Sequence, residues 1–261
     1  MVNNIAVPYN SLRRIIQIPL DQIIKLLVSS FLTASKYAKN ALANVLKIED
    51  KKILLALNTF EKKTITVTKY ELKKELKLTS NTFIIGCVGE LAKRKGHHVL
   101  VDAFNLLMQK QNNRIILLII GDGPEEKSLK KVILNYGLSE NILIVPFTDN
   151  IFNYYNIMDL YVHPTIAADD LPFAVREAMS MGLPILASDY AGIPELVKNE
   201  YNGILVTPGS SEILCDSIYD LINDHEKCKL MGENSIKVFQ EKLSKKMILD
   251  NYKNIFFKYI K

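Results

Sequence analysis

Two acidic side chains, eight positions apart, are well suited to bind a ligand rich in hydroxyl groups. Asp169 lies in the stretch AADDLPF, and Glu177 lies in the following stretch AVREAM. Because Pro172 suits the first position of a helix, we expect Asp169 in the preceding loop and Glu177 in the second helical turn. Both carboxylates would then face one cleft and accept strong hydrogen bonds from sugar or ribose hydroxyls. The alternative for Asp169 and Asp170 is an acidic first turn that stabilises the helix dipole.

A basic loop earlier in the chain offers cations to an anionic ligand. The stretch GELAKRKG, residues 89–96, carries Lys93, Arg94 and Lys95 between a predicted strand and a predicted helix. Such a loop can hold a diphosphate through a lysine ammonium and the backbone N–H groups of a helix start. Taken alone, the pattern also fits a surface loop whose basic side chains are simply solvated.

The elements that must position these groups form an α/β pattern. From residue 82 onward, short apolar runs alternate with longer helical patterns, which is typical of a parallel sheet wrapped by crossover helices. In such sheets, ligands bind beyond the carboxyl ends of the strands. We expect strands at 83–89, 114–121, 141–147, 160–164, 184–188 and 203–206, and helices around 99–107, 124–137, 151–158, 172–182, 211–223, 225–243 and 245–261.

This arrangement resembles the group 1 retaining glycosyltransferases, which are two-domain enzymes of the GT-B fold. The resemblance covers roughly residues 82–261. It implies the C-terminal half of that fold, a Rossmann-like parallel sheet sandwiched by helices that binds a nucleotide sugar. The matching features are Gly89 with Lys95-Gly96, the GDGP turn at 121–124, the acidic pair ending at Glu177, Gly182-x-Pro184, Gly192-x-Pro194-Glu195 and Asn202-Gly203.

The resemblance implies a role for each group in the two loops. Lys95 would neutralise the donor diphosphate as it leaves, Glu177 would bind the ribose hydroxyls, and Asp169 would contact the transferred sugar. Catalysis in this family needs no bound metal because Lys and Arg stabilise the leaving phosphate. We therefore expect a UDP- or GDP-sugar donor, no metal and no other cofactor. Further implied donor-site residues are Gly89 and Arg94 at the diphosphate, the backbone at Leu171 and Phe173, and Phe147 at the nucleobase.

Three features depart from the family pattern. Glu90 stands where the family commonly has arginine, and Arg94 is the cation expected to compensate. Asp169 is one methylene shorter than the usual glutamate. Residues 1–81 are too few for the complete N-terminal domain, which supplies the acceptor side and the catalytic histidine in this family. The histidines of this chain are therefore expected to be structural or solvated: His97, His98 and His163.

The predicted organisation has three segments. We expect residues 1–81 to form a helical remnant of the N-terminal domain and the interdomain connection, 82–244 the donor-binding domain, and 245–261 a C-terminal helix. The stretches FLTASKYAKNAL and ILLALN resemble the family's link between domains, with Asn58 at the connection. In the family, the last helix crosses back onto the first domain. Its apolar residues here would contact an acceptor-domain partner, a second copy or a membrane: Ile255, Phe256, Phe257 and Ile260.

An early apolar segment offers another surface. It is too short and too charged to span a membrane. Its pattern fits either a basic amphipathic helix lying on a membrane or a helix packed against protein. The residues that recur at helical spacing are Leu20, Ile23, Ile24, Leu27 and Phe31.

Composition sets the remaining expectations. With 261 residues, of which 48% are hydrophobic, the chain can bury a substantial core. A net charge of +5 is too modest to indicate nucleic acid as a partner. Cys87, Cys215 and Cys228 form no metal or disulfide pattern, and residues 1–14 lack the features of a secretory signal. These observations predict a cytoplasmic protein, with contact at the inner membrane face as an option.

The leading functional hypothesis is a hexosyltransferase that retains stereochemistry, and one form of this hypothesis is the donor-binding part of a split enzyme. A noncatalytic nucleotide-sugar-binding module is the main alternative, and a nucleotide-sugar epimerase is a third. A dinucleotide oxidoreductase is disfavoured because GDGP differs from GxGxxG and does not follow the first strand of the sheet.

Overall fold

The core of the protein is a six-stranded parallel sheet with the strand order β5-β4-β3-β6-β7-β8. The computed structural model describes residues 28–111, 114–167 and 169–257. Every strand pair in this sheet is parallel, as the alternating pattern predicts. The strands are β3 (Phe83–Val88), β4 (Ile115–Ile120), β5 (Ile142–Val145), β6 (Leu160–His163), β7 (Ile185–Ser188) and β8 (Gly203–Val206).

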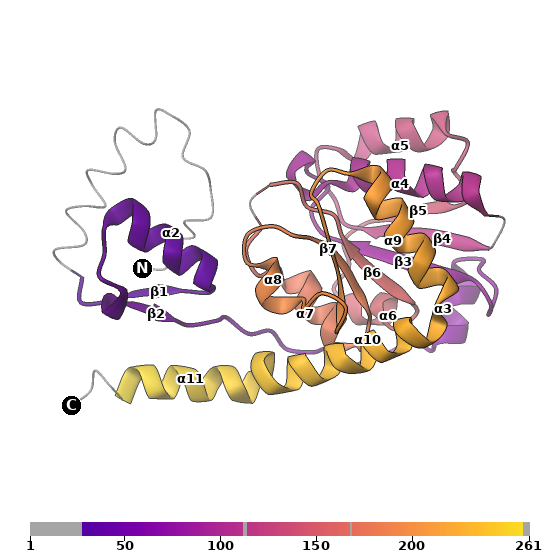
Figure 1. The fold of residues 1–261 in the computed structure, drawn as a ribbon. Helices are drawn as coiled ribbons and strands as arrows, with labels where there is room; N and C mark the ends of the chain where they lie inside the picture. Colours follow the sequence, from indigo (N-terminus) through magenta and orange to yellow (C-terminus); the bar gives the residue numbers. More distant parts are fainter. Residues whose placement is uncertain (1–27, 112–113, 168, 258–261) are drawn as a thin grey trace.

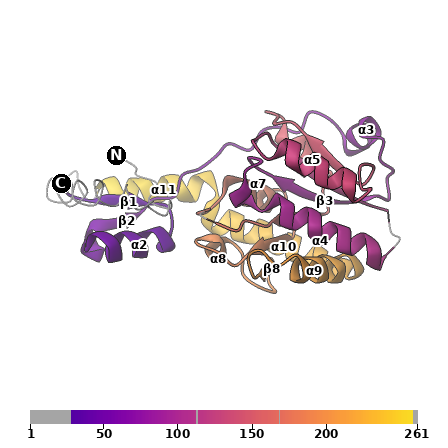
Figure 2. The same ribbon diagram turned by 90° about the horizontal axis from the view of Figure 1, so that it is seen from above.

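Helices cover both faces of this sheet, so alternate strand residues enter different cores. Ile85 and Leu117 pack on the first face, with α4 (His97–Lys110), α5 (Glu126–Asn135) and α9 (Ser211–Asn223) (Figure 2). Ile84 and Leu118 pack on the second face. The elements that contribute to this second core include α3 (Lys69–Glu75), α6 (Ile151–Tyr155), α7 (Phe173–Ser180) and α8 (Ile193–Leu196). Together they make the expected helix–sheet–helix sandwich.

The N-terminal region contains a strand pair in addition to the expected helix. Strands β1 (Phe31–Thr33) and β2 (Ile53–Leu55) are parallel and flank α2 (Lys36–Leu46). The expectation that Phe31 continues a helical face is wrong, because Phe31 pairs with Ile53 in this small sheet. Its partly buried side chain packs against a small core formed by Leu42, Leu46, Ile48 and Ile53. The other residues of that predicted face, 20–27, lie outside the described part of the chain.

The C-terminal helices return toward the N-terminal unit, which consists of β1, α2 and β2. α10 (His225–Val238) leads through a π-helical turn at Phe239–Leu243 into α11 (Lys245–Phe257). Figure 1 shows α2 above the β1–β2 pair and α11 below it. The Asn251 side-chain amide donates a hydrogen bond to the Leu55 carbonyl over 2.9 Å. None of the helices in the described ranges has both the length and the apolar character needed to cross a bilayer.

A buried arginine holds the connection between the two regions. Arg176 is 1% exposed and lies on α7, facing the segment that follows β2. Its guanidinium donates hydrogen bonds to the Asn58 backbone oxygen over 2.6 Å and to the Asn58 side-chain oxygen over 3.1 Å. The same group lies 4.3 Å from the centre of the Phe173 ring. Asn58, the predicted connection, is therefore tied to the larger domain by two charge-assisted hydrogen bonds.

His97, at the start of α4, is buried without a hydrogen-bond partner for either ring nitrogen in the described structure. Burial, together with the charges of the nearby His163 and Lys95, lowers the pKa of this imidazole to about 4. The sequence-based expectation of a structural or solvated histidine is thus met by a buried, neutral one. A protein with a buried polar ring that has no hydrogen-bond partner is less stable than the same protein with an apolar side chain of similar size at that position.

We predict that His97 makes the protein acid-sensitive between pH 6.5 and about 4. In this window the unfolded chain binds a proton at His97 and the folded chain does not, so stability falls as the pH falls. The loss should total about 3 kcal/mol at His97 and be complete near pH 4. Urea unfolding of wild type and His97→Leu across this range measures it. Parallel stability curves for the two proteins would contradict the prediction.

Candidate functional site

The two loops that carry the candidate residues meet at one edge of the sheet. Strands β3 and β6 are neighbours, with Gly86 opposite Tyr161 in the parallel register. The basic loop, residues 89–96, follows β3, and the loop that carries Asp169 and Asp170, called the acidic loop below, follows β6. Both loops begin at the carboxyl edge, where ligands bind in such sheets. Lys95 and Asp169 are 74 residues apart in the chain, and the pairing of β3 with β6 brings them together.

Gly96 allows the two loops to approach closely. Its φ of +71° is left-handed, and a Cβ atom at this position would lie 2.0 Å from the carbonyl oxygen of Pro164. The backbone oxygen of Arg94 accepts hydrogen bonds from the Ile166 N–H and the Thr165 hydroxyl, both over 2.9 Å. A side chain at residue 96 would force these loops apart and move Lys95 with them.

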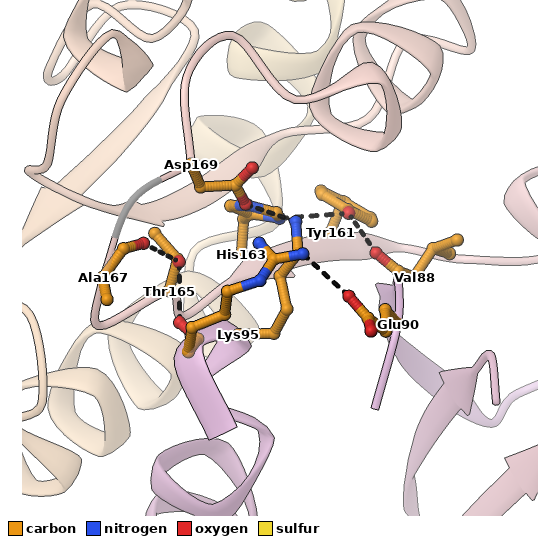
Figure 3. A network of polar contacts seen from close by, with 9 residues as sticks. Val88, Glu90, Lys95, Tyr161, His163, Thr165, Ala167 and Asp169 are labelled. Carbon is orange, nitrogen blue, oxygen red and sulfur yellow. Dashed lines mark hydrogen bonds and ion pairs between the residues drawn. The ribbon is translucent and has the colours of Figure 1, made fainter. Parts of the chain in front are cut away.

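Lys95 and Asp169 form a largely buried ion pair in which one carboxylate oxygen receives two donors. The Lys95 ammonium lies 2.5 Å from Oδ2 of Asp169, and Nε2 of His163 lies 2.7 Å from the same oxygen (Figure 3). The side chains of Lys95 and Asp169 are 13% and 10% exposed. The structure thus brings together the lysine and the first acid of the sequence-based hypothesis.

The charges of this cluster follow from its contacts. Burial raises the pKa of Asp169. The hydrogen bonds from His163 and Lys95, and the positive charges that these two groups carry at low pH, outweigh burial and lower this pKa to about 2. Burial lowers the pKa of His163. A carboxylate only accepts hydrogen bonds, so we assign the imidazole proton to Nε2 of His163. At neutral pH the cluster is therefore an anionic Asp169, a neutral His163 and a cationic Lys95.

Glu177 lies apart from this ion pair and is linked to it through tyrosines. The Tyr155 hydroxyl donates to Oε2 of Glu177 over 3.0 Å, and burial raises the pKa of Glu177. The rings of Tyr155 and Tyr161 lie 5.9 Å apart. The Tyr161 hydroxyl in turn lies 3.4 Å from Nδ1 of His163. A row of aromatic side chains therefore connects Glu177 to Asp169, without direct contact between the two acids.

Arg94, the other predicted phosphate ligand, is paired with a carboxylate of its own loop. Its guanidinium lies 2.8 Å from the Glu90 carboxylate, and both side chains are about half exposed. Figure 3 shows Glu90 next to Val88, at the end of β3. Gly89, just before Glu90, has open space where a side chain would project. Arg94, the cation expected to compensate for Glu90 at the diphosphate, thus pairs with Glu90 itself in this structure.

The remaining predicted residues have different environments. The Phe147 side chain is 69% exposed, and its backbone N–H donates to Asp122. Leu171 is buried in the core, with a left-handed φ of 48° that is strained for leucine. Phe173 begins α7, and its ring contacts Phe60 and Arg176. Among these residues, Phe147 offers a free aromatic face to a planar ligand.

The acidic loop also holds the N-terminal unit. Neither Asp169 nor Asp170 lies in the first turn of α7, which excludes the helix-dipole alternative. Asp170 instead accepts a hydrogen bond from the Ser35 hydroxyl over 2.7 Å. Glu195 accepts from the backbone N–H groups of Lys36 and Tyr37 at the start of α2, over 3.0 and 2.9 Å.

The sequence analysis missed the contacts of His163 and Asp170. His163 carried a local signal, because it ends a strand six residues before Asp169. Asp170 carried none, because its partner is 135 residues away. No group of three or more His, Cys, Asp and Glu side chains within the described residues is arranged to hold a metal ion.

Comparison with known proteins places the chain in a family. The family model described as "Glycosyl transferases group 1" matches residues 68–238. The chain is 28% identical over 203 residues to the capsular polysaccharide biosynthesis glycosyltransferase CapM of Staphylococcus aureus, covering 77% of this chain and 53% of CapM. It is 25% identical over 187 residues to the N-acetyl-alpha-D-glucosaminyl L-malate synthase of Bacillus anthracis, covering 72% and 48%. The chain spans about half the length of the curated relatives it matches.

Solved structures agree on the fold. HepE of Anabaena, in complex with UDP and glucose, superposes with a TM-score of 0.84 at 22% identity, covering 99% of this chain and 69% of HepE. The C-terminal domain of the group 1 family protein LpcC from Francisella tularensis gives a TM-score of 0.58 at 23% identity, covering 62% and 87%. With its parallel Rossmann-like sheet and the family match over residues 68–238, this chain belongs to the group 1 glycosyl transferases.

Proposed function

We propose that this chain binds a nucleoside-diphosphate sugar beside Lys95 and Asp169 and transfers a hexose from it with retention of stereochemistry. The observation that carries the proposal is the meeting of a lysine ammonium and a buried carboxylate at the carboxyl edge of the sheet. An ammonium suits the diphosphate, and a carboxylate suits the sugar hydroxyls. Family membership supports the transferase class.

Each residue receives a distinct role in this proposal. Lys95 stabilises the charge that develops on the leaving diphosphate, and no metal is assigned to this task. Asp169 accepts hydrogen bonds from the transferred sugar, and His163 is a positioning residue that fixes its carboxylate. Glu177 binds the ribose, and Phe147 packs against the nucleobase. The Lys95 ammonium must turn from Asp169 to the phosphate when the donor binds.

The identity of the nucleotide stays open between uridine and guanosine. HepE was solved with UDP and glucose, whereas a Mycobacterium tuberculosis relative is a GDP-mannose-dependent mannosyltransferase. Both are proteins that this chain resembles at 25% identity or less. We therefore propose that either a UDP-sugar or a GDP-sugar is the donor.

The acceptor side of the reaction is proposed to come from another polypeptide or a second copy. The described N-terminal unit has only the two strands β1 and β2, and parallel sheets normally have more strands and helices on both faces. On α11, Phe256 and Phe257 are exposed beside this unit. We also propose a cytoplasmic location, with contact at the inner membrane face as an option.

We predict that purified chain releases nucleotide from a donor sugar in the presence of an acceptor-side partner. Release is measured for a panel of UDP- and GDP-sugars, with and without candidate acceptors. Donor binding without transfer in any of these mixtures would favour a noncatalytic binding module. Conversion of the donor to an isomeric sugar without an acceptor would instead indicate an epimerase.

Lys95→Ala is expected to weaken binding of a nucleoside diphosphate by about tenfold to a hundredfold, and binding of the nucleoside much less. The physical reason is the loss of one charge-assisted contact to phosphate. Calorimetric titration with UDP and uridine, or GDP and guanosine, measures both losses. Lys227→Ala is the matched control. Lys227 lies on α10 and pairs with Glu200, and its neighbours His225 and Lys229 line a pocket with Phe83 and Arg114 at the opposite edge of the sheet. Equal losses for nucleotide and nucleoside would remove Lys95 from the phosphate site.

Glu177→Gln is expected to abolish the preference for a ribose with free hydroxyls. A neutral amide accepts hydrogen bonds more weakly than a carboxylate, so affinity for the ribonucleotide should fall about fivefold to fiftyfold. Affinity for the corresponding 2′,3′-dideoxynucleotide should change less than twofold. The ratio of the two dissociation constants is the measurement. If the variant keeps the wild-type ratio, Glu177 does not bind the ribose.

A further inference from the structure

The candidate phosphate loop holds two ion pairs of different character. Lys95 pairs with Asp169 in a largely buried setting, where His163 also binds the same carboxylate. Arg94 pairs with Glu90, and these side chains are 43% and 54% exposed. Both cations expected to meet a phosphate are thus matched by carboxylates of this chain. The two acids carry as much negative charge as the two bases carry positive charge.

The Glu90–Arg94 ion pair contributes little to the stability of the fold. Exposed ion pairs contribute about 0–1 kcal/mol to stability. The basic loop is held by other contacts: its backbone accepts hydrogen bonds from Thr165 and Ile166, and Gly96 packs against Pro164. Removing the Glu90 charge should therefore leave the loop in place. Glu90 is therefore expected to affect ligand binding by the loop rather than the structure of the loop.

We propose that Glu90 competes with the phosphate groups of the donor for Arg94 and so sets how strongly the site responds to ligand charge. This inference rests on the proposed donor site. A phosphate that approaches Arg94 meets the Glu90 carboxylate, which lies 2.8 Å from the same guanidinium. To bind Arg94, the phosphate has to replace the Glu90 carboxylate at this guanidinium. The attraction to Arg94 that is lost rises with the negative charge of the ligand, so Glu90 weakens the binding of diphosphates more than the binding of monophosphates.

The size of this effect can be bounded. A cation freed to face a phosphate about 6 Å away at a protein surface changes a binding constant by about threefold to tenfold, depending on the local dielectric constant. The effect should shrink at high salt because the pair is exposed. Glu90 is thus a specificity-determining residue whose presence narrows the difference in affinity between a nucleoside diphosphate and the monophosphate.

The test uses Glu90→Gln in the full chain, with UDP, UMP and uridine as probes and GDP, GMP and guanosine in parallel. We expect diphosphate binding to tighten about threefold to tenfold, monophosphate binding to tighten less, and nucleoside binding to stay unchanged. The control is Asp216→Asn, which also removes one negative charge from an exposed ion pair. Its partner Lys110 lies at the far end of α4, about 20 Å from the helix start near the loop.

Arg94→Ala distinguishes competition from simple repulsion. If Glu90 acts by holding Arg94, Glu90→Gln should change diphosphate affinity less than twofold in the Arg94→Ala background. A gain that persists without Arg94 would overturn the proposed competition, as would a wild-type affinity ratio in Glu90→Gln alone. If Lys95→Ala still weakens the diphosphate in that case, the donor site survives and only the role of Glu90 is lost. If neither Lys95→Ala nor Glu90→Gln alters binding, both proposals fail.

Discussion

The parallel pairing of β3 with β6 brings the ends of both strands to one edge of the sheet, and the candidate site depends on this arrangement. Both strands lie centrally, and their buried residues pack against helices on both faces. The loops that follow them can therefore meet although they are far apart in the chain. Gly96 permits their contact, because its missing side chain leaves room for the Pro164 carbonyl. The same constraint places Lys95 beside Asp169.

Electrostatics then gives the site its character. A buried carboxylate must be compensated, and Asp169 receives Lys95 and His163 on one oxygen. This keeps Asp169 ionised at all physiological pH values, with a pKa of about 2. Burial raises the pKa of Glu177, which accepts a hydrogen bond from the Tyr155 hydroxyl. The two acids thus differ in environment: one is held by charges and the other by a tyrosine hydroxyl.

The acidic loop also joins the two regions of the chain. Asp169 contacts the basic loop, whereas its neighbour Asp170 accepts a hydrogen bond from the Ser35 hydroxyl. The same hydroxyl caps α2 by accepting a hydrogen bond from the Ala38 N–H. Glu195 binds the first backbone N–H groups of the same helix. Carboxylates at a helix start are favourable because the N–H groups there have no partners within the helix. A shift of the N-terminal unit would therefore act on residues directly beside the proposed donor site.

The six parallel strands, the approximate positions of the main helices around them and the family resemblance were predictable from the amino-acid sequence alone. These features are encoded locally: apolar runs such as Ile115–Ile120 specify buried strands, and Pro172 and Gly137 mark helix ends. Which distant side chains meet depends instead on the folded arrangement. Glu177 pairs with Tyr155 and Asp170 with Ser35, while Phe31 enters a strand because Ile53 lies beside it. Such partners come from chain crossings and burial, which spacing along the sequence does not specify.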